Sequence, residues 1–285
     1  MNAGQGRVLR VRSRNADFQQ WQSLLGNRTK RNRHGEFLVQ GVRPITLALE
    51  RGWPVHALLG VEGRLSSWAQ SVWDSAGAHQ HALLAEELMA ELGGKEESAP
   101  ELLAVLELPA DDLERLVKED HGQVPRPPLI TVFDRPGSPG NIGTLVRSVD
   151  AFGGDGVVVT GHAADPYDPR CVRASTGSML TVPVVRAPSH SEVLAWVRDR
   201  QDRDGVPWVV LGLDEEGGTP LRETDLTGPT VLVVGNETRG LTRAWREACD
   251  AVVSIPMVGE ASSLNAAVAG SVVLHEALRQ RSSTD

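Results

Sequence analysis

Six short, strongly apolar segments alternate with helical segments in the second half of this chain, and this alternation constrains the fold most. The expected strands cover residues 129–133, 156–160, 182–186, 206–211, 230–234 and 251–255. Helices with an apolar stripe are expected between them at 141–152, 189–203 and 238–248. Several strands are apolar without interruption, which is typical of strands covered on both faces. The pattern predicts an α/β domain with a mainly parallel, doubly wound sheet.

The first half of the chain shows a smaller alternation of the same kind. Helices are expected at 15–25, 42–50, 66–73 and 85–92, and strands at 36–40, 55–61 and 102–106. Residues 1–12 are expected to form a mobile arm, and residues 26–35 a cationic loop bounded by glycines. We therefore predict a small α/β domain over residues 1–108, an acidic, proline-rich linker over 109–127 and the larger domain over 128–285.

Charge is spread unevenly along an acidic chain. The sequence carries 29 Lys and Arg against 37 Asp and Glu, a formal net charge of −8, which argues against non-specific coating of nucleic acid. Residues 1–34 nevertheless contain eight basic side chains and one acid, Asp17; the basic residues are Arg7, Arg10, Arg12, Arg14, Arg28, Lys30, Arg31 and Arg33. This basic end fits either local contact with a phosphate backbone or a solvated arm.

Several classes of function are disfavoured by what the sequence lacks. No apolar run approaches the ~20 residues that a membrane span needs, and the N-terminus lacks the apolar core of a secretory signal, so a cytoplasmic protein is expected. Cys171 and Cys249 lie far apart and outside any metal-ligand spacing, so neither a disulfide framework nor a metal site is expected. The chain has no P-loop, no dinucleotide fingerprint after a strand and no nucleophile elbow.

Polar segments follow three of the expected strands, where the ligand crevice of an open parallel sheet lies. In the first, residues 134–148, Arg147 points away from the apolar stripe of a helix that begins near Asn141. Its forked donors suit a phosphate, although an isolated arginine there also fits an ordinary surface residue. A small-residue loop at 173–178 carries a second outward arginine, Arg173, and also fits a simple helix end.

The other two segments lie further along the chain. Residues 233–241 place a glycine, an amide and a carboxylate directly after a buried strand, although Asn and Glu there also fit ordinary turn formers. In residues 255–270 Pro256 ends the sheet pairing, and Ser262 or Ser263 is expected to cap the final helix. Exposed amides at that helix start suit a polar ligand, although the segment alone also fits an ordinary strand–loop–helix joint.

Taken together and in this order, these segments resemble the signature of the SPOUT superfamily, in its TrmH/SpoU branch of RNA ribose 2′-O-methyltransferases. The first family motif is matched by Asn141, Gly143, Arg147, Phe152 and Gly153. The second is matched by Gly235, Asn236, Glu237, Gly240 and Leu241. The third is matched by Ile255, Pro256, Met257, Gly259, Ser263, Leu264 and Asn265. The 173–178 loop looks like the family's intervening Arg/Lys-Ser-x-Gly segment.

The resemblance extends to the first domain and has one departure. Residues 37–43 resemble the strand-to-helix start of the family's RNA-binding module of the L30e-like fold, with Gln40 in place of a glutamate. The layout and arginine-rich composition are also similar to the antibiotic-resistance 23S rRNA methyltransferases of actinomycetes, of the thiostrepton- or avilamycin-resistance type. Ala266 and Ala267 stand where many relatives have Val-Ser, which is expected to remove a hydroxyl near the cofactor.

What the resemblance implies is specific. It implies a SPOUT domain with a deep trefoil knot, and a homodimer. It also implies S-adenosyl-L-methionine as methyl donor and rRNA rather than tRNA as substrate. A tRNA methyltransferase and a non-catalytic rRNA-binding protein of the same fold remain alternatives. The implied cofactor-binding residues are Leu211, Gly212, Gly235, Asn236, Ile255, Met257, Ser263 and Leu264. The implied catalytic residues are Asn141, Arg147, Glu237, Ser263 and Asn265. The expected RNA-binding residues are Arg28, Lys30, Arg31, Arg33, Arg147 and Arg173.

The roles of these residues follow from their chemistry. The family assigns proton acceptance to the motif-one arginine, but a guanidinium stays protonated in nearly all protein sites. We therefore expect Arg147 to clamp the adjacent phosphate and stabilise the oxyanion. Asn141 is expected to orient the nucleotide, and Glu237 to fix either Arg147 or the nucleotide.

Overall fold

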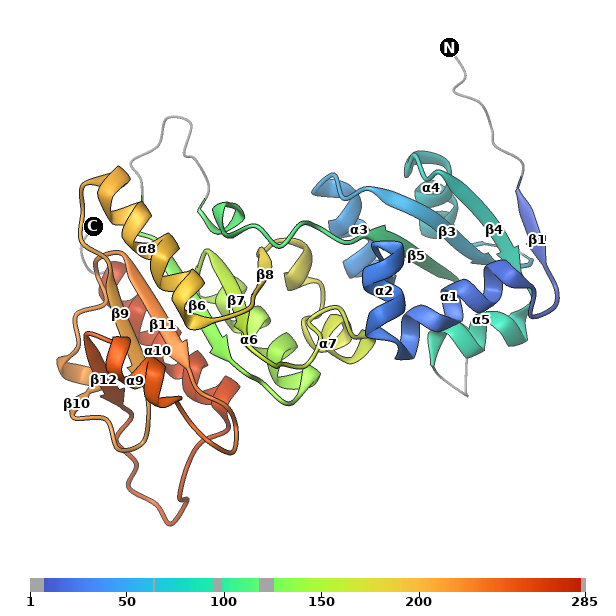
Figure 1. The fold of residues 1–285 in the computed structure, drawn as a ribbon. Coiled ribbons are helices and arrows are strands. Elements are labelled where there is room, and N and C mark those ends of the chain that lie inside the picture. Colours follow the sequence, from blue (N-terminus) through green and yellow to red (C-terminus); the bar gives the residue numbers. More distant parts are fainter. Residues whose placement is uncertain (1–7, 64, 95–98, 118–125, 283–285) are drawn as a thin grey trace. The chain divides into compact units, whose positions relative to one another are not determined.

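The computed structural model describes residues 8–63, 65–94, 99–117 and 126–282 (Figure 1). The chain divides into two compact units, one formed by Met1–Pro109 with Tyr167–Leu180 and the other by Ala110–Pro166 with Thr181–Asp285. The chain therefore passes between the units three times, after residues 109, 166 and 180. Residues 1–7 of the expected arm, Arg7 among them, and residues 118–125 of the expected linker lie outside the described part.

The first unit is built on a five-stranded mixed sheet in the order β1-β4-β3-β5-β2. Its strands are β1 Leu9–Val11, β2 Glu36–Gln40, β3 Val55–Val61, β4 Gln80–Leu84 and β5 Leu102–Glu107. Its helices are α1 Ala16–Gly26, α2 Arg28–His34, α3 Val42–Glu50, α4 Ser67–Ser75, α5 Glu86–Gly93, α7 Pro169–Ala174 and the 3-10 turn η2 Ser178–Leu180. A core of aliphatic and aromatic side chains, including Phe18, Trp21 and Leu59, fixes α1 to the sheet.

Two expectations at the N-terminus were wrong. Residues 9–11 of the expected arm form β1, which pairs parallel with β4 and buries Val11. A strand of three residues is too short to show an alternating pattern. The expected cationic loop is helix α2, because the Asn27 side chain accepts from the Lys30 amide at 3.0 Å and Gly35, at φ 68°, ends the helix.

The second unit contains a seven-stranded sheet in the order β10-β12-β9-β11-β6-β7-β8, and every strand pair is parallel. Its strands are β6 Leu129–Asp134, β7 Gly156–Thr160, β8 Val184–Ala187, β9 Val209–Leu213, β10 Thr219–Pro220, β11 Thr230–Val234 and β12 Ala251–Ser254. Its helices are α6 Pro139–Ala151, α8 His190–Asp204, α9 Arg243–Ala248 and α10 Ala266–Ser282, with the 3-10 turns η1 Leu113–Leu116 and η3 Leu221–Glu223. The predicted mainly parallel α/β sheet is confirmed.

The strand order explains where a site forms in this unit. From β6 the chain moves outward to β7 and β8, and then crosses to β9, β11 and β12 on the other side of β6. In such a sheet, ligands bind beyond the carboxyl ends of the strands, near the point where the strand order reverses. Helix α6 follows β6, and α10 lies against α6, where the Ser271 hydroxyl bonds the Ser148 hydroxyl at 2.7 Å.

Element boundaries differ from expectation in places that shape the site. Strand β9 runs to Leu213, because its pairing with β11 continues for two residues beyond the expected end. Helix α9 begins at Arg243 rather than at 238, because Asn236 and Gly240 close a tight turn by two backbone hydrogen bonds. The acidic stretch after Pro109 contains only the short turn η1 among the described residues.

Candidate functional site

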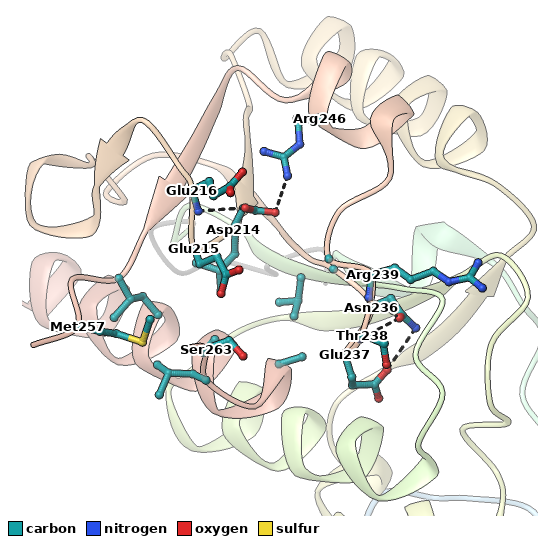
Figure 2. A pocket seen from close by; sticks show the side chains of 18 residues that line it. Asp214, Glu215, Glu216, Asn236, Glu237, Thr238, Arg239, Arg246, Met257 and Ser263 are labelled. Carbon is teal, nitrogen blue, oxygen red and sulfur yellow. Dashed lines mark hydrogen bonds and ion pairs between the residues drawn. The ribbon is translucent and has the colours of Figure 1, made fainter. Parts of the chain in front are cut away.

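A pocket of about 350 Å³ lies at the carboxyl ends of β9, β11 and β12 (Figure 2). This volume is typical of small-molecule sites. In Figure 2, Met257 and Ser263 stand on one side of the pocket, and Asn236 and Glu237 on the other. The second and third polar segments of the sequence therefore meet around one cavity.

Six of the eight expected cofactor-binding residues line this pocket. They are Gly235, Asn236, Ile255, Met257, Ser263 and Leu264. Leu211 and Gly212 do not line it, because both lie inside β9, where Leu211 is 2% exposed and the Gly212 backbone packs against Leu241 and Cys249. Since β9 extends further than expected, Leu213 and Asp214 take their place at the cavity.

The turn after β11 presents its backbone to the pocket. A Cβ on Gly235 would lie 2.4 Å from the carbonyl carbon of Gly240, so only glycine allows this close approach. The Asn236 side chain holds the turn from within, since its oxygen accepts from the amides of Thr238 and Arg239 at 3.0 and 3.1 Å. Its Nδ2 donates to the carbonyl of Arg135 at 2.7 Å. The turn is therefore fixed before any ligand binds.

Glu237 ties this turn to the beginning of α6. Its carboxylate accepts from the backbone amides of Gly137 at 2.9 Å and Ser138 at 3.2 Å, and from Asn141 Nδ2 at 3.0 Å. Partial burial disfavours the charged form, but the Gly137 amide and the further donors outweigh it and lower the pKa of Glu237. Glu237 is thus held as a carboxylate that accepts hydrogen bonds.

Asn265 connects the third segment to the same cluster. Its Nδ2 donates to Asn141 Oδ1 at 3.2 Å, and its Oδ1 accepts from the amides of Ala267 and Val268 at 3.0 and 3.3 Å. Asn265 therefore caps α10, and the expectation that Ser262 or Ser263 does so was wrong. One hydrogen-bonded chain, Glu237–Asn141–Asn265, joins the three motif segments.

Arg147 lies apart from this chain. It is exposed on α6, and within the described ranges it has no ion-pair or hydrogen-bond partner. Glu237 contacts the start of α6 rather than Arg147, so the first of its two expected roles is not realised in this structure. Ser263 is exposed and lines the pocket. Ala267 is fully buried inside α10, so the hydroxyl that this chain lacks would face the protein interior and not the pocket.

Several polar residues of the pocket, Asp214 and Arg246 among them, were missed by the sequence reasoning. Asp214 follows β9, and its carboxylate pairs with the Arg246 guanidinium of α9 at 2.7 Å, as Figure 2 shows. Asp214 also accepts from the amide of Glu216 at 3.1 Å. The signal was present, because Asp214 follows a buried strand as Asn236 does, but the expected end of that strand was two residues too early.

The cationic residues of the first unit that the sequence singled out differ in exposure and in pairing. Arg28 and Arg33 on α2 and Arg173 on α7 are exposed. Arg31 is only 2% exposed and donates to the carbonyl of Leu24 at 2.5 Å, so it fixes α2 to the end of α1 and is not available to RNA. Near β1, Arg10 and Arg12 pair with Glu62, and Arg14 pairs with Glu91.

Comparison with known proteins identifies the family. Residues 128–275 match the SpoU rRNA Methylase family, and residues 15–104 match the SpoU L30e-like domain. The protein belongs to the SpoU rRNA methylase family. It is 54% identical over 274 residues to the 23S rRNA (uridine(2479)-2′-O)-methyltransferase of Streptomyces viridochromogenes, covering 95% of this chain and 92% of that protein. The family predicted from the three motifs is confirmed, as is the L30e-like fold of the first domain.

Solved structures agree with this assignment. The SpoU methyltransferase AviRb from Streptomyces viridochromogenes, in complex with the cofactor AdoMet, superposes with a TM-score of 0.88 at 53% identity, covering 95% of this chain and 99% of that chain. An AdoMet-bound rRNA methyltransferase from Sinorhizobium meliloti gives a TM-score of 0.82 at 25% identity, covering 96% and 98% of the two chains.

The pocket described above fits S-adenosylmethionine. Ile255, Met257 and Leu264 supply apolar surface for an adenine ring, and the carboxylates of Asp214 and Glu215 suit hydroxyl, ammonium or sulfonium groups. The described residues include no group of three or more His, Cys, Asp or Glu side chains placed to hold a metal ion. Among the helices described, none has the length and apolarity needed to cross a membrane.

Proposed function

We propose that this protein transfers the methyl group of S-adenosylmethionine to a ribose 2′-hydroxyl of 23S rRNA in the cytoplasm. The observation that carries the proposal is that the Glu237–Asn141–Asn265 chain joins all three motif segments, two of which line one cofactor-sized pocket. The identity of 54% with a 23S rRNA 2′-O-methyltransferase supports the choice of rRNA.

Asn141, Glu237 and Arg147 have different roles in this reaction. Bound S-adenosylmethionine would be held by pocket residues such as Ile255, Met257 and Leu264, and it would supply the methyl group that the ribose 2′-oxygen accepts. Asn141, held between Glu237 and Asn265, orients the nucleotide, and such positioning supplies much of the rate. Glu237 holds Asn141 and the start of α6 in place. Arg147 clamps the adjacent phosphate and stabilises the developing oxyanion.

The protein acts as a homodimer in this proposal. Apolar side chains are exposed along α10 and on the loop before it: Val268, Val272, Leu278, Met257 and Val258. A second copy covering this face would bury them and approach the exposed Arg147 on the neighbouring helix α6. We also propose that the chain around the pocket forms the trefoil knot of the family, with residues 255–265 as its threaded part.

The first unit is proposed to hold the RNA. Its match to the SpoU L30e-like domain, its exposed cations Arg28, Arg33 and Arg173 and the half-buried Lys30 support this role. Modification of 23S rRNA near the binding site of a ribosome-targeting antibiotic would then confer resistance. The drug susceptibility of cells with and without the gene tests that consequence.

Methyl transfer from labelled S-adenosylmethionine tests the main proposal. We expect incorporation into 23S rRNA and a reverse-transcription stop at one nucleotide when the nucleotide concentration is low. Incorporation into tRNA instead would replace rRNA with tRNA as substrate. An absence of incorporation into any RNA, together with retained RNA binding, would favour a non-catalytic rRNA-binding protein.

A further inference from the structure

Arg135, the residue that directly follows β6, has an unusual backbone. Its φ of 52° lies in the left-handed region, and within the described ranges the only other non-glycine residue with positive φ is Thr176. A Cβ makes this conformation unfavourable, so it persists only where surrounding contacts enforce it. Such residues cluster where a protein needs a particular local geometry.

Contacts between the ends of β6 and β7 enforce this conformation. The Arg135 amide donates to the carbonyl of Thr160 at 3.0 Å. Its Nε donates to the Asp134 carboxylate at 3.0 Å, and the Thr160 hydroxyl donates to the other oxygen of that carboxylate at 3.0 Å. Asp134 and Thr160 are 4% and 1% exposed, so the carboxylate and its hydroxyl donor are shielded from water, while the Arg135 side chain is 25% exposed.

The conformation directs Arg135 toward the turn that lines the pocket. Its carbonyl accepts from Asn236 Nδ2 at 2.7 Å, and its Nη2 lies 3.5 Å from the carbonyl of Gly240. These are the two residues that close the turn containing Glu237. Arg135 itself is not among the residues that line the pocket. It contacts the turn from outside the pocket and touches both of its ends.

We propose that Arg135, with Asp134 and Thr160, is a positioning unit that sets the Asn236–Gly240 turn and through it the affinity for S-adenosylmethionine. The unit connects the ends of β6, β7 and β11, which are also joined by sheet pairing and, after β6 and β11, by the Glu237 bonds to Gly137 and Ser138. The inference rests on the proposed function only for the identity of the ligand. The effect on the order of the Asn236–Gly240 turn does not depend on the ligand and can be measured without it.

Calorimetric titration of the full-length protein with S-adenosylmethionine tests the inference. We expect Arg135→Ala to weaken binding about tenfold, because both the ion pair with Asp134 and the side-chain contact with the Gly240 carbonyl are lost. Arg135→Lys keeps a donor for Asp134 but lacks the fork that also reaches Gly240, so it should recover part of the affinity. Thr160→Val should weaken binding by about threefold, since it removes one donor from Asp134.

Arg186→Ala is the matched control. Arg186 is a half-buried arginine of the same unit whose Nε bonds Asp111 at 2.8 Å, away from the pocket. It should lower the melting temperature without changing the dissociation constant of the folded protein. If Arg135→Ala also lowers only the melting temperature, then Arg135 has a general stabilising role and the inference is overturned.

Hydrogen exchange separates this inference from the proposed function. In the absence of ligand, the amides of Thr238 and Arg239 should exchange faster in Arg135→Ala than in the wild type or in Arg186→Ala. Equal exchange rates in all three would overturn the positioning role. A wild-type protein that binds S-adenosylmethionine but methylates no RNA would overturn the proposed function alone.

Discussion

The pocket end of the second unit and the cationic surface of the first unit use polar residues in opposite ways. Around the pocket, polar groups bond to one another: Glu237 accepts from four donors, and Asn141 lies between Glu237 and Asn265. On α2, by contrast, Arg28 and Arg33 extend toward solvent from a helix without an acid in its first turn. The first arrangement fixes a geometry, and the second provides an electrostatic surface.

This difference predicts how each region responds to change. A hydrogen bond to a charged, partly buried group contributes about 1.5–3 kcal/mol, so a single substitution near the pocket should have a large effect. A surface cation contributes through counterion release, with a slope of about 0.7–0.9 per phosphate contact, so several must be removed together. The predictions below test this contrast.

The largest effect is expected for Glu237→Gln. The side-chain nitrogen of the new glutamine must then face the backbone amide of either Gly137 or Ser138, so at least one of these donors loses its acceptor. We expect the single-turnover rate on 23S rRNA to fall about 100-fold. Glu247→Gln, at an exposed carboxylate of α9 paired with Arg243, is the control and should retain the wild-type rate. Equal rates for both variants would show that the pocket network is no more sensitive than the surface.

Gly235→Ala should act on the cofactor rather than on the chemical step. The new Cβ would overlap the backbone of Gly240, so the turn must shift, at a cost of about 1–3 kcal/mol. We expect the dissociation constant for S-adenosylmethionine to rise about 30-fold, measured by calorimetry. Gly228→Ala places its Cβ in open space and should bind normally. Normal binding by Gly235→Ala would indicate a turn that adapts easily, against the rigid network inferred here.

Replacing Arg28, Lys30 and Arg33 together by Ala should reduce affinity for a 23S rRNA fragment about tenfold at low salt. The slope of log affinity against log salt should flatten by about 2–3, because each phosphate contact contributes about 0.7–0.9. Arg10, Arg12 and Arg14 are the matched control, since each is paired with Glu62 or Glu91, which offset two of the three positive charges. An equal loss in both triple variants would mean that net charge rather than the α2 surface determines binding.

Much of the fold was predictable because burial produces regular sequence patterns. The strands β3, β7 and β11 were predicted to the residue, since each is a mainly apolar run between turn-forming residues. Strands β1, β4 and β10 were missed. Strands β1 and β10 contain only two or three residues at a sheet edge and carry no periodicity, and β4, Gln80–Leu84, begins with two polar residues. The grouping of Tyr167–Leu180 with the first unit was also missed, because it depends on long-range packing such as the ring contact between Phe37 and Tyr167 at 5.0 Å.

The candidate site was predictable in its members and less so in its contacts. The motifs placed Gly235, Asn236 and Ser263 at a ligand crevice, which the structure brings together. The sequence could not show that Glu237 bonds the start of α6 or that Arg31 is buried, because a carboxylate or arginine of the same type also fits an exposed position. Arg135 carries no sequence signal at all, since its backbone conformation follows from contacts among three strands.

The smallest effect concerns two glutamates whose pKa values are lowered for different reasons. For Glu62 the main cause is the side-chain hydrogen bond from Arg12, in a solvent-exposed pair. For Glu237, burial opposes ionisation, and the Gly137 amide with the other donors outweighs it. Because both folded pKa values lie below the unfolded value of about 4.3, each glutamate stabilises the fold above that pH and loses its contribution as the pH falls through its folded pKa. NMR titration should show the Glu62 shift shrinking in about 1 M salt, where exposed pairs are screened, while the Glu237 shift persists. If salt reduces both pKa shifts equally, the pKa of Glu237 depends on screened surface charge rather than on fixed hydrogen bonds. The contrast between the pocket network and the cationic surface would then be wrong.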